Sequence, residues 1–298
     1  MAVKQAPAVV PGQSKPNTVI KKSPSFLGST RKPITDVQDS TTMAFGGSNY
    51  SVKLANETGY ASAIWINVTA TGGAGASVAG QLDAPFNFIN SINLSGPMTK
   101  GIWNMSGYSL YLINKYGDLL GIGGSSDPML MPSYSPIDPS TGDFRFSLRI
   151  PFEYIRGEGL VSWSNAQSQV KLNVTPNTSG DVYSTAPTTL PTVTATFDIE
   201  YYPVPNSLVM PTNWGNLITC IEGQLTQNFG GGTSTKISGT PFGGKLTGLI
   251  MVTRASGTNV RTEAWPSGLN RTSINIDSDI ADNITTTNKR LLPHTQSH

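Results

Sequence analysis

The sequence has few of the residues that catalysis and metal binding most often use. It contains one cysteine, Cys220, and two histidines, His294 and His298, both within the last five of its 298 residues. A single cysteine can form neither an internal disulfide nor a cysteine cluster for a metal ion. Nucleophilic catalysis with a histidine base needs that histidine held in place by the fold, and a chain end is a poor place for one. We therefore predict no enzyme activity: no catalytic residues, no cofactor and no metal site.

Charged residues are also scarce. They make up 13% of the chain, about half the usual share of roughly 25%, and the net charge is +2. Glycine, proline, serine, threonine and asparagine take their place, a mixture that favours many strands joined by many turns. Few charges suit a subunit that packs against neighbours, but they also suit a rigid secreted β-protein.

Long apolar segments are missing as well. The start of the chain, "MAVKQAPAVVPGQSKP", has no apolar stretch of the kind found in a signal peptide. The strongest apolar run, "LTGLIMV", is far shorter than the ~20 residues of a membrane-spanning helix. We expect the protein to be synthesised and folded in a cytoplasm.

The first 38 residues differ from the rest and are predicted to form a basic, proline-rich arm. No acidic residue precedes Asp36, and prolines at 7, 11, 16, 24 and 33 interrupt regular structure. Such an arm is either a solvated tail or a segment that contacts an anionic partner, which could be nucleic acid or a lipid surface. Its candidate contact residues are Lys4, Lys15, Lys21, Lys22, Arg31 and Lys32.

From about residue 41 the pattern is mostly that of β-strands. In "TVTATFDIEYYPVP" the residues Val193, Ala195, Phe197, Ile199 and Tyr201 alternate with polar ones, which predicts a long strand with one buried face. Shorter segments of the same kind are "SNYSVKL", "SAIWINVTA" and "QVKLNVTPN". The exception is 107–120, where apolar residues have helical spacing and Ser106 or Ser109 is a candidate cap. We predict a short helix there, and the alternative is another strand with a tight turn.

One stretch matches the beginning of a phosphate-binding loop. "GTPFGGKL" has the spacing of Gly239, Gly244 and Lys245, but Leu246 replaces the hydroxyl residue that would bind Mg²⁺. The following "LTGLIMVTR" indicates a strand rather than a helix N-terminus. We interpret the stretch as a turn leading into a buried strand.

Four segments together resemble the double-jelly-roll major capsid proteins of tailless, membrane-containing icosahedral phages, the tectivirus-like lineage that includes the adenovirus hexon. They are "APFNFINSINLSG", "FRFSLRIPFEYI", "TVTATFDIEYYPVP" and "PFGGKLTGLIMVTR", and the resemblance covers roughly 40–280. It implies an all-β chain of tandem jelly-roll β-barrels, with a first jelly roll at 39–205 and a second at 206–298. Because a jelly roll has eight strands and 206–298 contains fewer strand patterns, the second is expected to be short or incomplete.

The resemblance also implies a function. Members of this family form homotrimeric, pseudo-hexagonal capsomers of a virus shell. The expected partners are neighbouring capsomers, penton and minor capsid proteins, and an internal lipid membrane reached by the N-terminal arm, without recognition of a specific nucleic-acid sequence. The expected location is the capsid shell of the virion. The alternative from a different class is a phage spike, fibre or lectin-like β-sandwich that binds glycans, which the scattered tryptophans would suit.

Overall fold

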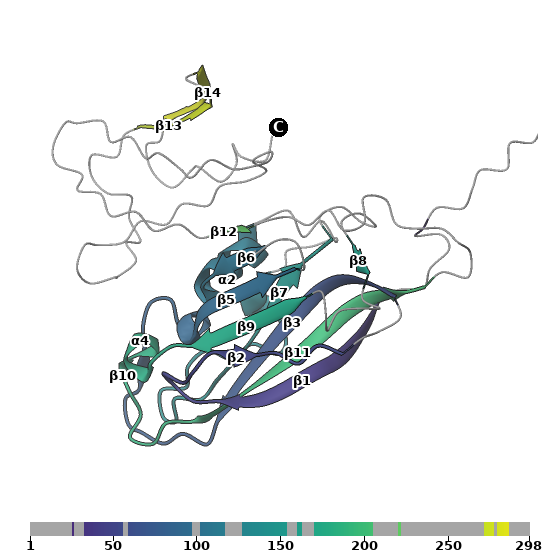
Figure 1. The fold of residues 1–298 in the computed structure, drawn as a ribbon. Coiled ribbons are helices and arrows are strands. Elements are labelled where there is room, and N and C mark those ends of the chain that lie inside the picture. The colour runs from purple at the N-terminus through teal and green to yellow at the C-terminus, as the bar shows by residue number, and fades with distance from the viewer. Residues whose placement is uncertain are drawn as a thin grey trace, which may run out of the picture.

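The computed structural model describes residue 26, residues 33–55, 59–96, 102–116, 127–153, 160–162 and 170–204, and the backbone of 220–221, 271–276 and 279–285. The described chain is mostly β, as predicted (Figure 1). Its strands are β1 (Ile34–Met43), β2 (Tyr50–Ser51), β3 (Gly59–Thr71), β4 (Ala79–Gly80), β5 (Ile89–Ser95), β6 (Trp103–Met105), β7 (Phe144–Pro151), β8 (Val161–Ser162), β9 (Lys171–Pro176), β10 (Tyr183–Thr185), β11 (Thr192–Pro203), β12 (Cys220–Ile221), β13 (Arg271–Ile276) and β14 (Asp279–Thr285). Its helices are η1 (Phe86–Phe88), α2 (Gly107–Tyr116), η3 (Pro128–Leu130) and α4 (Ser179–Val182).

The strand order is that of a jelly roll. Sheet A has the order β1-β11-β3-β7, with β8 also paired to β3, and sheet B contains β6-β5-β9-β2. Neighbours among these main strands are antiparallel. The eight main strands are β1, β2, β3, β5, β6, β7, β9 and β11. If these are renumbered one to eight along the chain, sheet A has the order 1-8-3-6 and sheet B the order 2-7-4-5. Two Greek-key sheets connected in this way form the eight-stranded jelly roll.

The described parts of 206–298 are three strands. β12 pairs in parallel with β6 and so extends sheet B at that edge, and β13 and β14 form an antiparallel pair. The second jelly roll and the domain boundaries stay predictions, as does the interpretation of "GTPFGGKL", which lies outside the described residues.

The core lies between the two sheets. Along β11 the residues Val193, Ala195, Phe197 and Ile199 are buried while the residues between them are half-buried, which confirms the predicted alternation up to Ile199. At the end of the strand Tyr201, which was predicted to be buried, is half-buried, and Tyr202 is buried instead. They meet apolar side chains from the inner faces of the other strands, among them Ile66, Phe146, Ile92 and Leu172. Burial of one face of each strand supplies the main driving force for this sandwich.

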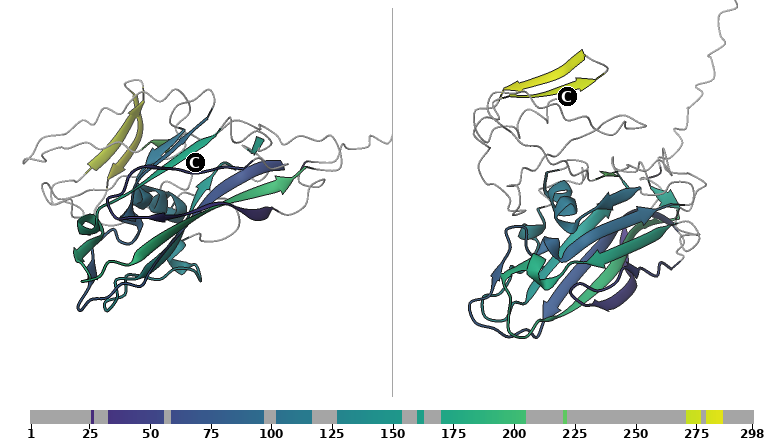
Figure 2. Two further views of the ribbon diagram at one scale, coloured as in Figure 1. Left: turned by 60° about the horizontal axis from the view of Figure 1, so that its bottom comes forward. Right: turned by 60° about the vertical axis from the view of Figure 1, so that its left-hand side comes forward.

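The predicted helix is α2, which packs against β5, β7 and η1. Ser106 is its cap: the Ser106 Oγ accepts a hydrogen bond from the Ser109 backbone N–H at 3.2 Å. Figure 2 shows α2 beside β5 from two further directions. At its other end, the Asn114 side chain donates to the Arg149 carbonyl at 2.7 Å and accepts from the Arg149 N–H at 2.8 Å. This amide therefore satisfies backbone groups on β7, the last strand in the order of sheet A, as the Ser135 backbone does for Arg145.

β1 is a strand that the sequence pattern did not indicate in full. Its sequence, ITDVQDSTTM, is polar and mostly exposed, and it begins at Ile34, within the segment 1–38 assigned to the arm. It is a strand because its backbone pairs with β11 along almost its whole length. An edge strand has only one hydrogen-bonded neighbour and little buried surface, so its side chains need not alternate.

Gly107 at the start of α2 allows the helix to approach η1. A Cβ at this position would lie 2.8 Å from Ile89 Cβ and would also contact the Phe86 carbonyl oxygen. We expect Gly107→Ala to destabilise the fold by about 1–3 kcal/mol through overpacking, measured by urea unfolding. Gly180→Ala is the matched control, because Gly180 is exposed and its added Cβ would meet only Thr178 Oγ1, at 4.0 Å. Equal stability of the two variants would contradict this packing argument.

Candidate contact face on the outer side of sheet A

The side of sheet A that faces away from the core is polar yet largely covered. Strand alternation places Asp198 and Glu200 of β11 on this side, together with Trp65 and Asn67 of β3. On β7, Arg149 is 7% exposed. An outward sheet face that is only solvated would leave such side chains exposed. We call this side the outer face of sheet A.

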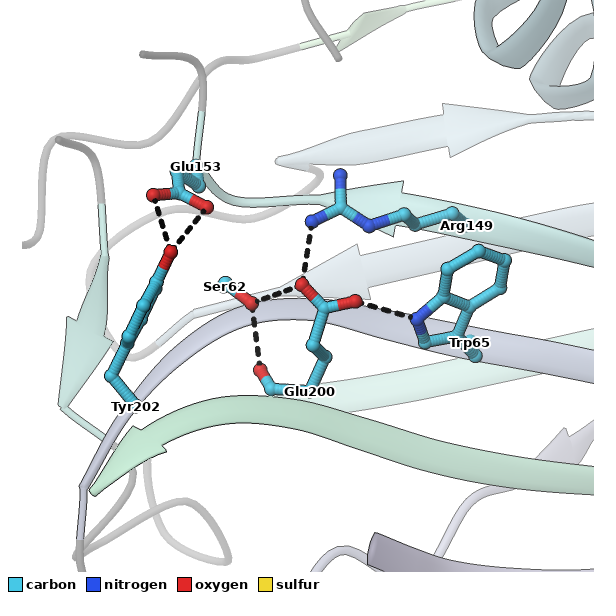
Figure 3. A network of polar contacts seen from close by, with 6 residues as sticks. All are labelled: Ser62, Trp65, Arg149, Glu153, Glu200 and Tyr202. Atoms are coloured by element: carbon cyan, nitrogen blue, oxygen red, sulfur yellow. Dashed lines mark hydrogen bonds and ion pairs between the residues drawn. The ribbon is translucent and has the colours of Figure 1, made fainter. Parts of the chain in front are cut away.

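Glu200 lies at the centre of a group of side chains that hydrogen-bond to its carboxylate (Figure 3). Its carboxylate accepts from Ser62 Oγ at 2.7 Å, from Trp65 Nε1 at 2.9 Å and from Arg149 Nη2 at 2.9 Å. The side chains of Arg149 and Glu200 are 8% and 16% exposed. We call Ser62, Trp65, Arg149 and Glu200 the Glu200 network.

The pKa of Glu200 reflects this environment. Burial by itself raises the pKa of the carboxyl group, but the charge of Arg149 and the three donors outweigh burial, and the pKa is lowered. Ser62 reaches Glu200 because β3 has a bulge there: Ala63 pairs with Glu200 and Ala61 with Tyr201. The extra residue, Ser62, accepts backbone hydrogen bonds from Phe152 and Glu153 through its carbonyl oxygen.

A shallow hollow of about 320 Å³ adjoins the network. It is lined by Thr35, Trp65, Asn67, Met131, Pro132, Ser133, Ser147, Asp198 and Glu200. Asp198 Oδ2 accepts from Asn67 Nδ2 at 2.7 Å, whereas Asp198 Oδ1 is buried without a hydrogen-bond partner in the described structure. Burial, reinforced by the charge of Asp36, raises the pKa of Asp198 despite the bond from Asn67. The hollow therefore combines apolar lining from Trp65, Met131 and Pro132 with the carboxylate of Asp198, whereas the charge of Glu200 is paired with Arg149.

A small apolar cluster covers the outer face near the end of β11. It consists of Phe26, Tyr60, Leu160 and Tyr202, and it is separate from the main core. Phe26 packs edge-on against Tyr60, with ring centroids 5.5 Å apart, and against Tyr202 at 5.8 Å. The Tyr202 hydroxyl donates to Glu153 Oε1 at 3.1 Å (Figure 3), and Glu153 is 2% exposed. We call this group the Phe26 cluster.

The predicted contact residues of the arm, Lys4, Lys15, Lys21, Lys22, Arg31 and Lys32, lie outside the described residues. Among residues 1–32 the described residue is Phe26, which the sequence analysis did not single out. Its only signal was an aromatic and an aliphatic residue side by side in "SPSFLGST". The Glu200 network was also missed, although acidic residues inside an alternating strand pattern, as in "FDIEYY", are unusual enough to suggest partners.

Two largely buried carboxylates of this region take part in contacts within the fold. The Glu200 carboxylate is engaged by three donors, and Glu153 is buried against Tyr202. Within the described part of the chain, no group of three or more histidine, cysteine, aspartate or glutamate side chains could hold a metal ion. Among the described helices, none is long and apolar enough to cross a membrane. The outer face of sheet A thus carries a hollow that contains the Asp198 carboxylate and an aromatic site that Phe26 fills.

Comparison with protein-family models gave no match, and comparison with curated proteins gave none either. Among solved structures, the fold is similar to the major capsid protein of Sulfolobus turreted icosahedral virus, with 14% identity and a TM-score of 0.40 over 58% of this chain and 49% of that protein. It is similar to VP54 of PBCV-1, with 14% identity and a TM-score of 0.43 over 59% of this chain and 43% of that protein. A chain of the PBCV-1 virus capsid has 14% identity and a TM-score of 0.41. This chain thus spans less than half the length of these viral proteins, and its own strand order defines it as a jelly roll.

Proposed function

We propose that the protein is a structural major capsid protein that forms pseudo-hexagonal homotrimers in the shell of an icosahedral virus. The observation that carries this proposal is the jelly roll preceded by a basic, proline-rich arm. Jelly rolls are used in viral capsid and lectin domains, among others. A cationic arm before the first strand suits a shell subunit that faces an enclosed anionic surface.

The outer face of sheet A supports a packing role rather than a chemical one. Its carboxylates are paired or buried, and its side chains are half-covered although the face points away from the core. In a trimer and between capsomers, such a face would be a contact surface, because paired polar groups can be covered by a neighbour with little further loss of hydration. Penton and minor capsid proteins would contact the same kind of surface at the edges of the capsomer.

The arm is proposed to contact an internal lipid membrane, as in the tectivirus-like lineage of phages. Each basic residue close to an anionic membrane contributes about 1 kcal/mol, and the attraction fades beyond a Debye length of roughly 8–10 Å. Six cations without an acidic neighbour would thus give a salt-sensitive attachment that does not depend on nucleic-acid sequence. The virion shell is the corresponding location.

The decisive experiment is native mass spectrometry together with electron microscopy of the purified chain. A stable trimer that joins into shells or flat arrays supports the proposal. Deletion of residues 1–24, which leaves Phe26 and β1 in place, should preserve the trimer and weaken its flotation with anionic vesicles. A monomer that never assembles, at any concentration or salt tested, would contradict the proposed function.

A second candidate is glycan binding, as in a phage spike, fibre or lectin. The hollow beside Trp65 favours it, because sugars stack on indole rings and bond to aspartate and asparagine side chains. Against it, the Trp65 indole N–H is used by Glu200, and the Arg149 guanidinium lies 5.9 Å from the ring centroid. A glycan array would separate the two: retention of a sugar by wild type but not by Asp198→Ala supports a lectin, and no retention supports the capsid role.

A further inference from the structure

Two carboxylates line the hollow on the outer face of sheet A, and only one of them has a counter-charge among the described residues. Glu200 forms an ion pair with Arg149 at 2.9 Å. Asp198 accepts a hydrogen bond from the neutral Asn67 side chain at 2.7 Å, and its other oxygen, Oδ1, is buried with no donor in the described part of the chain. A buried carboxylate oxygen without a donor is costly, so Asp198 is the group in the hollow that would gain most from a bound cation.

The register of the strands separates Asp198 from Arg149. One row of paired residues crosses sheet A from β1 to β7 in the order Val37, Asp198, Trp65 and Arg149. Trp65 therefore stands between Asp198 and Arg149 in this row, and the Arg149 guanidinium is directed at Glu200 (Figure 3). On the other side of Asp198 the paired residue is Val37, which is 61% exposed. Asp198 thus has an aromatic and an aliphatic neighbour, and neither can compensate its charge.

The rest of the lining favours an organic cation over a metal ion. A metal ion of the calcium type needs several oxygen ligands, and the described residues contain no group of three or more histidine, cysteine, aspartate or glutamate side chains that could hold one. Trp65, Met131 and Pro132 instead give the hollow apolar walls. An alkylammonium group combines a charge for the carboxylate with an alkyl stem for such walls, and indole rings attract cations. The volume of about 320 Å³ lies within the range of ligand pockets, roughly 300–1,000 Å³.

The hydrogen bond from Asn67 favours an ammonium over a guanidinium. A guanidinium binds a carboxylate best through two parallel hydrogen bonds, one to each oxygen. Asn67 already donates to Asp198 Oδ2, whereas an ammonium is a compact charge that needs only one further acceptor site. The hydroxyls of Ser133 and Ser147, whose Oγ atoms lie 3.3 Å apart, line the same hollow and are additional acceptors.

Negative charge prevails around Asp198. Burial raises the pKa of Asp198, and the charge of Asp36 on β1 raises it further. Both effects mean that the ionised form of this carboxylate lacks compensation. The ion pair of Arg149 with Glu200 is the one described ion pair that involves Asp36, Asp198 or Glu200. A cation in the hollow would therefore reduce the imbalance of charge and stabilise the ionised Asp198.

We propose that the hollow binds a primary alkylammonium group, with its charge at Asp198 and its alkyl stem against Met131 and Pro132. Two sources carry this group: a lysine side chain of a second copy of this chain, and a free aliphatic diamine. The inference goes beyond the proposed function, because a shell subunit and a glycan-binding protein could both have such a site. It assigns a charged ligand to the hollow, whereas the sugar of the glycan candidate is neutral.

The test uses butylammonium chloride as the probe and butanol as the matched neutral control. The full chain is labelled with fluorotryptophan, and the fluorine resonance of Trp65 is identified by its absence from Trp65→Phe. We expect butylammonium to shift this resonance saturably and butanol to leave it nearly unchanged, because butanol has the stem without the charge.

Two variants of equal charge change locate the binding. Asp198→Asn keeps the shape of the side chain and should weaken the binding of butylammonium at least about tenfold. Asp181→Asn removes an exposed carboxylate of α4 and should change it less than about twofold. The thermal midpoint of each variant shows that it is folded.

Native mass spectrometry of the same proteins distinguishes the two sources. If a lysine of a second copy fills the hollow, Asp198→Asn should lower the assembled fraction at least about fivefold, and butylammonium should do the same to wild type. If the ligand is a free diamine, assembly should be unchanged and diaminobutane should shift the Trp65 resonance as butylammonium does.

Two results would overturn the cation site. One is an equal response of Trp65 to butylammonium and to butanol, or an equal response to butylammonium in wild type and Asp198→Asn. The other is the absence of any response together with unchanged assembly of Asp198→Asn. The native mass of wild type alone tests the proposed shell function, so the two proposals fail separately.

Discussion

Replacing Phe86 with alanine is expected to destabilise the jelly roll by about 3–5 kcal/mol, because it leaves a cavity where three elements meet. Phe86 is fully buried in η1 and stacks on Tyr111 of α2, with ring centroids 4.1 Å apart. It also packs against Phe146 of β7 at 5.2 Å and against Tyr134 at 5.9 Å. Removal of the ring therefore deletes packing contacts with both α2 and β7.

The effect can be measured as a shift of the thermal midpoint. A domain of this size loses about 2–4 °C per kcal/mol, so Phe86→Ala should unfold roughly 6–20 °C earlier. Tyr116→Ala is the matched control, since Tyr116 is an aromatic residue of α2 that is 45% exposed, and its loss should cost less than about 1 kcal/mol. Phe86→Leu should lie between the two. If the thermal midpoint of Phe86→Ala lay within about 2 °C of wild type, the loss of stability would be only about 1 kcal/mol or less, and the packing argument for Phe86 would be contradicted.

Breaking the ion pair between Arg149 and Glu200 is expected to have an effect of similar size. Glu200→Gln leaves the Arg149 guanidinium nearly buried without a counter-charge, and the loss of one partner of such a pair costs about 3–5 kcal/mol. Arg145→Gln on the exposed part of β7 is the control and should be nearly neutral. The double variant Arg149→Met/Glu200→Leu should recover most of the stability, because no unpaired charge remains.

The same pair predicts how stability depends on pH. The folded pKa of Glu200 is lowered, so its contribution is present above the unfolded value of about 4.3 and is lost as pH falls through the folded pKa. Asp198 acts with the opposite sign: its folded pKa is raised, so the folded state gains a proton first and gains stability as pH falls toward about 3.9. Urea midpoints between pH 3 and 7 should therefore fall less steeply with acid in Glu200→Gln and more steeply in Asp198→Asn. Parallel curves for wild type and both variants would contradict these assignments.

The strands with a strict alternation could be predicted from the sequence. In β11 and β3, apolar residues at every second position fix both the conformation and the face that enters the core, because one face of a strand in a sandwich must be buried. Ser106 and the apolar spacing after it likewise indicated α2. These features depend on neighbours a few residues apart, which a single sequence contains.

The arrangement of side chains on the outer face of sheet A could not be predicted from the sequence, because it depends on contacts between residues far apart in the chain. Glu200 meets Arg149 across 51 positions and Ser62 across 138, and the polar strand β1 is held by pairing with β11. Phe26 is buried only because Tyr60, Leu160 and Tyr202 converge at one end of the sheet. The sequence by itself thus determined the β class, the buried strand faces and the shortage of catalytic residues. Only the tertiary structure decided the jelly-roll strand order, the partners of the buried charges and the burial of Phe26. The reason is that strand pairing and burial bring together segments that are far apart in the chain, and no local sequence pattern encodes these contacts.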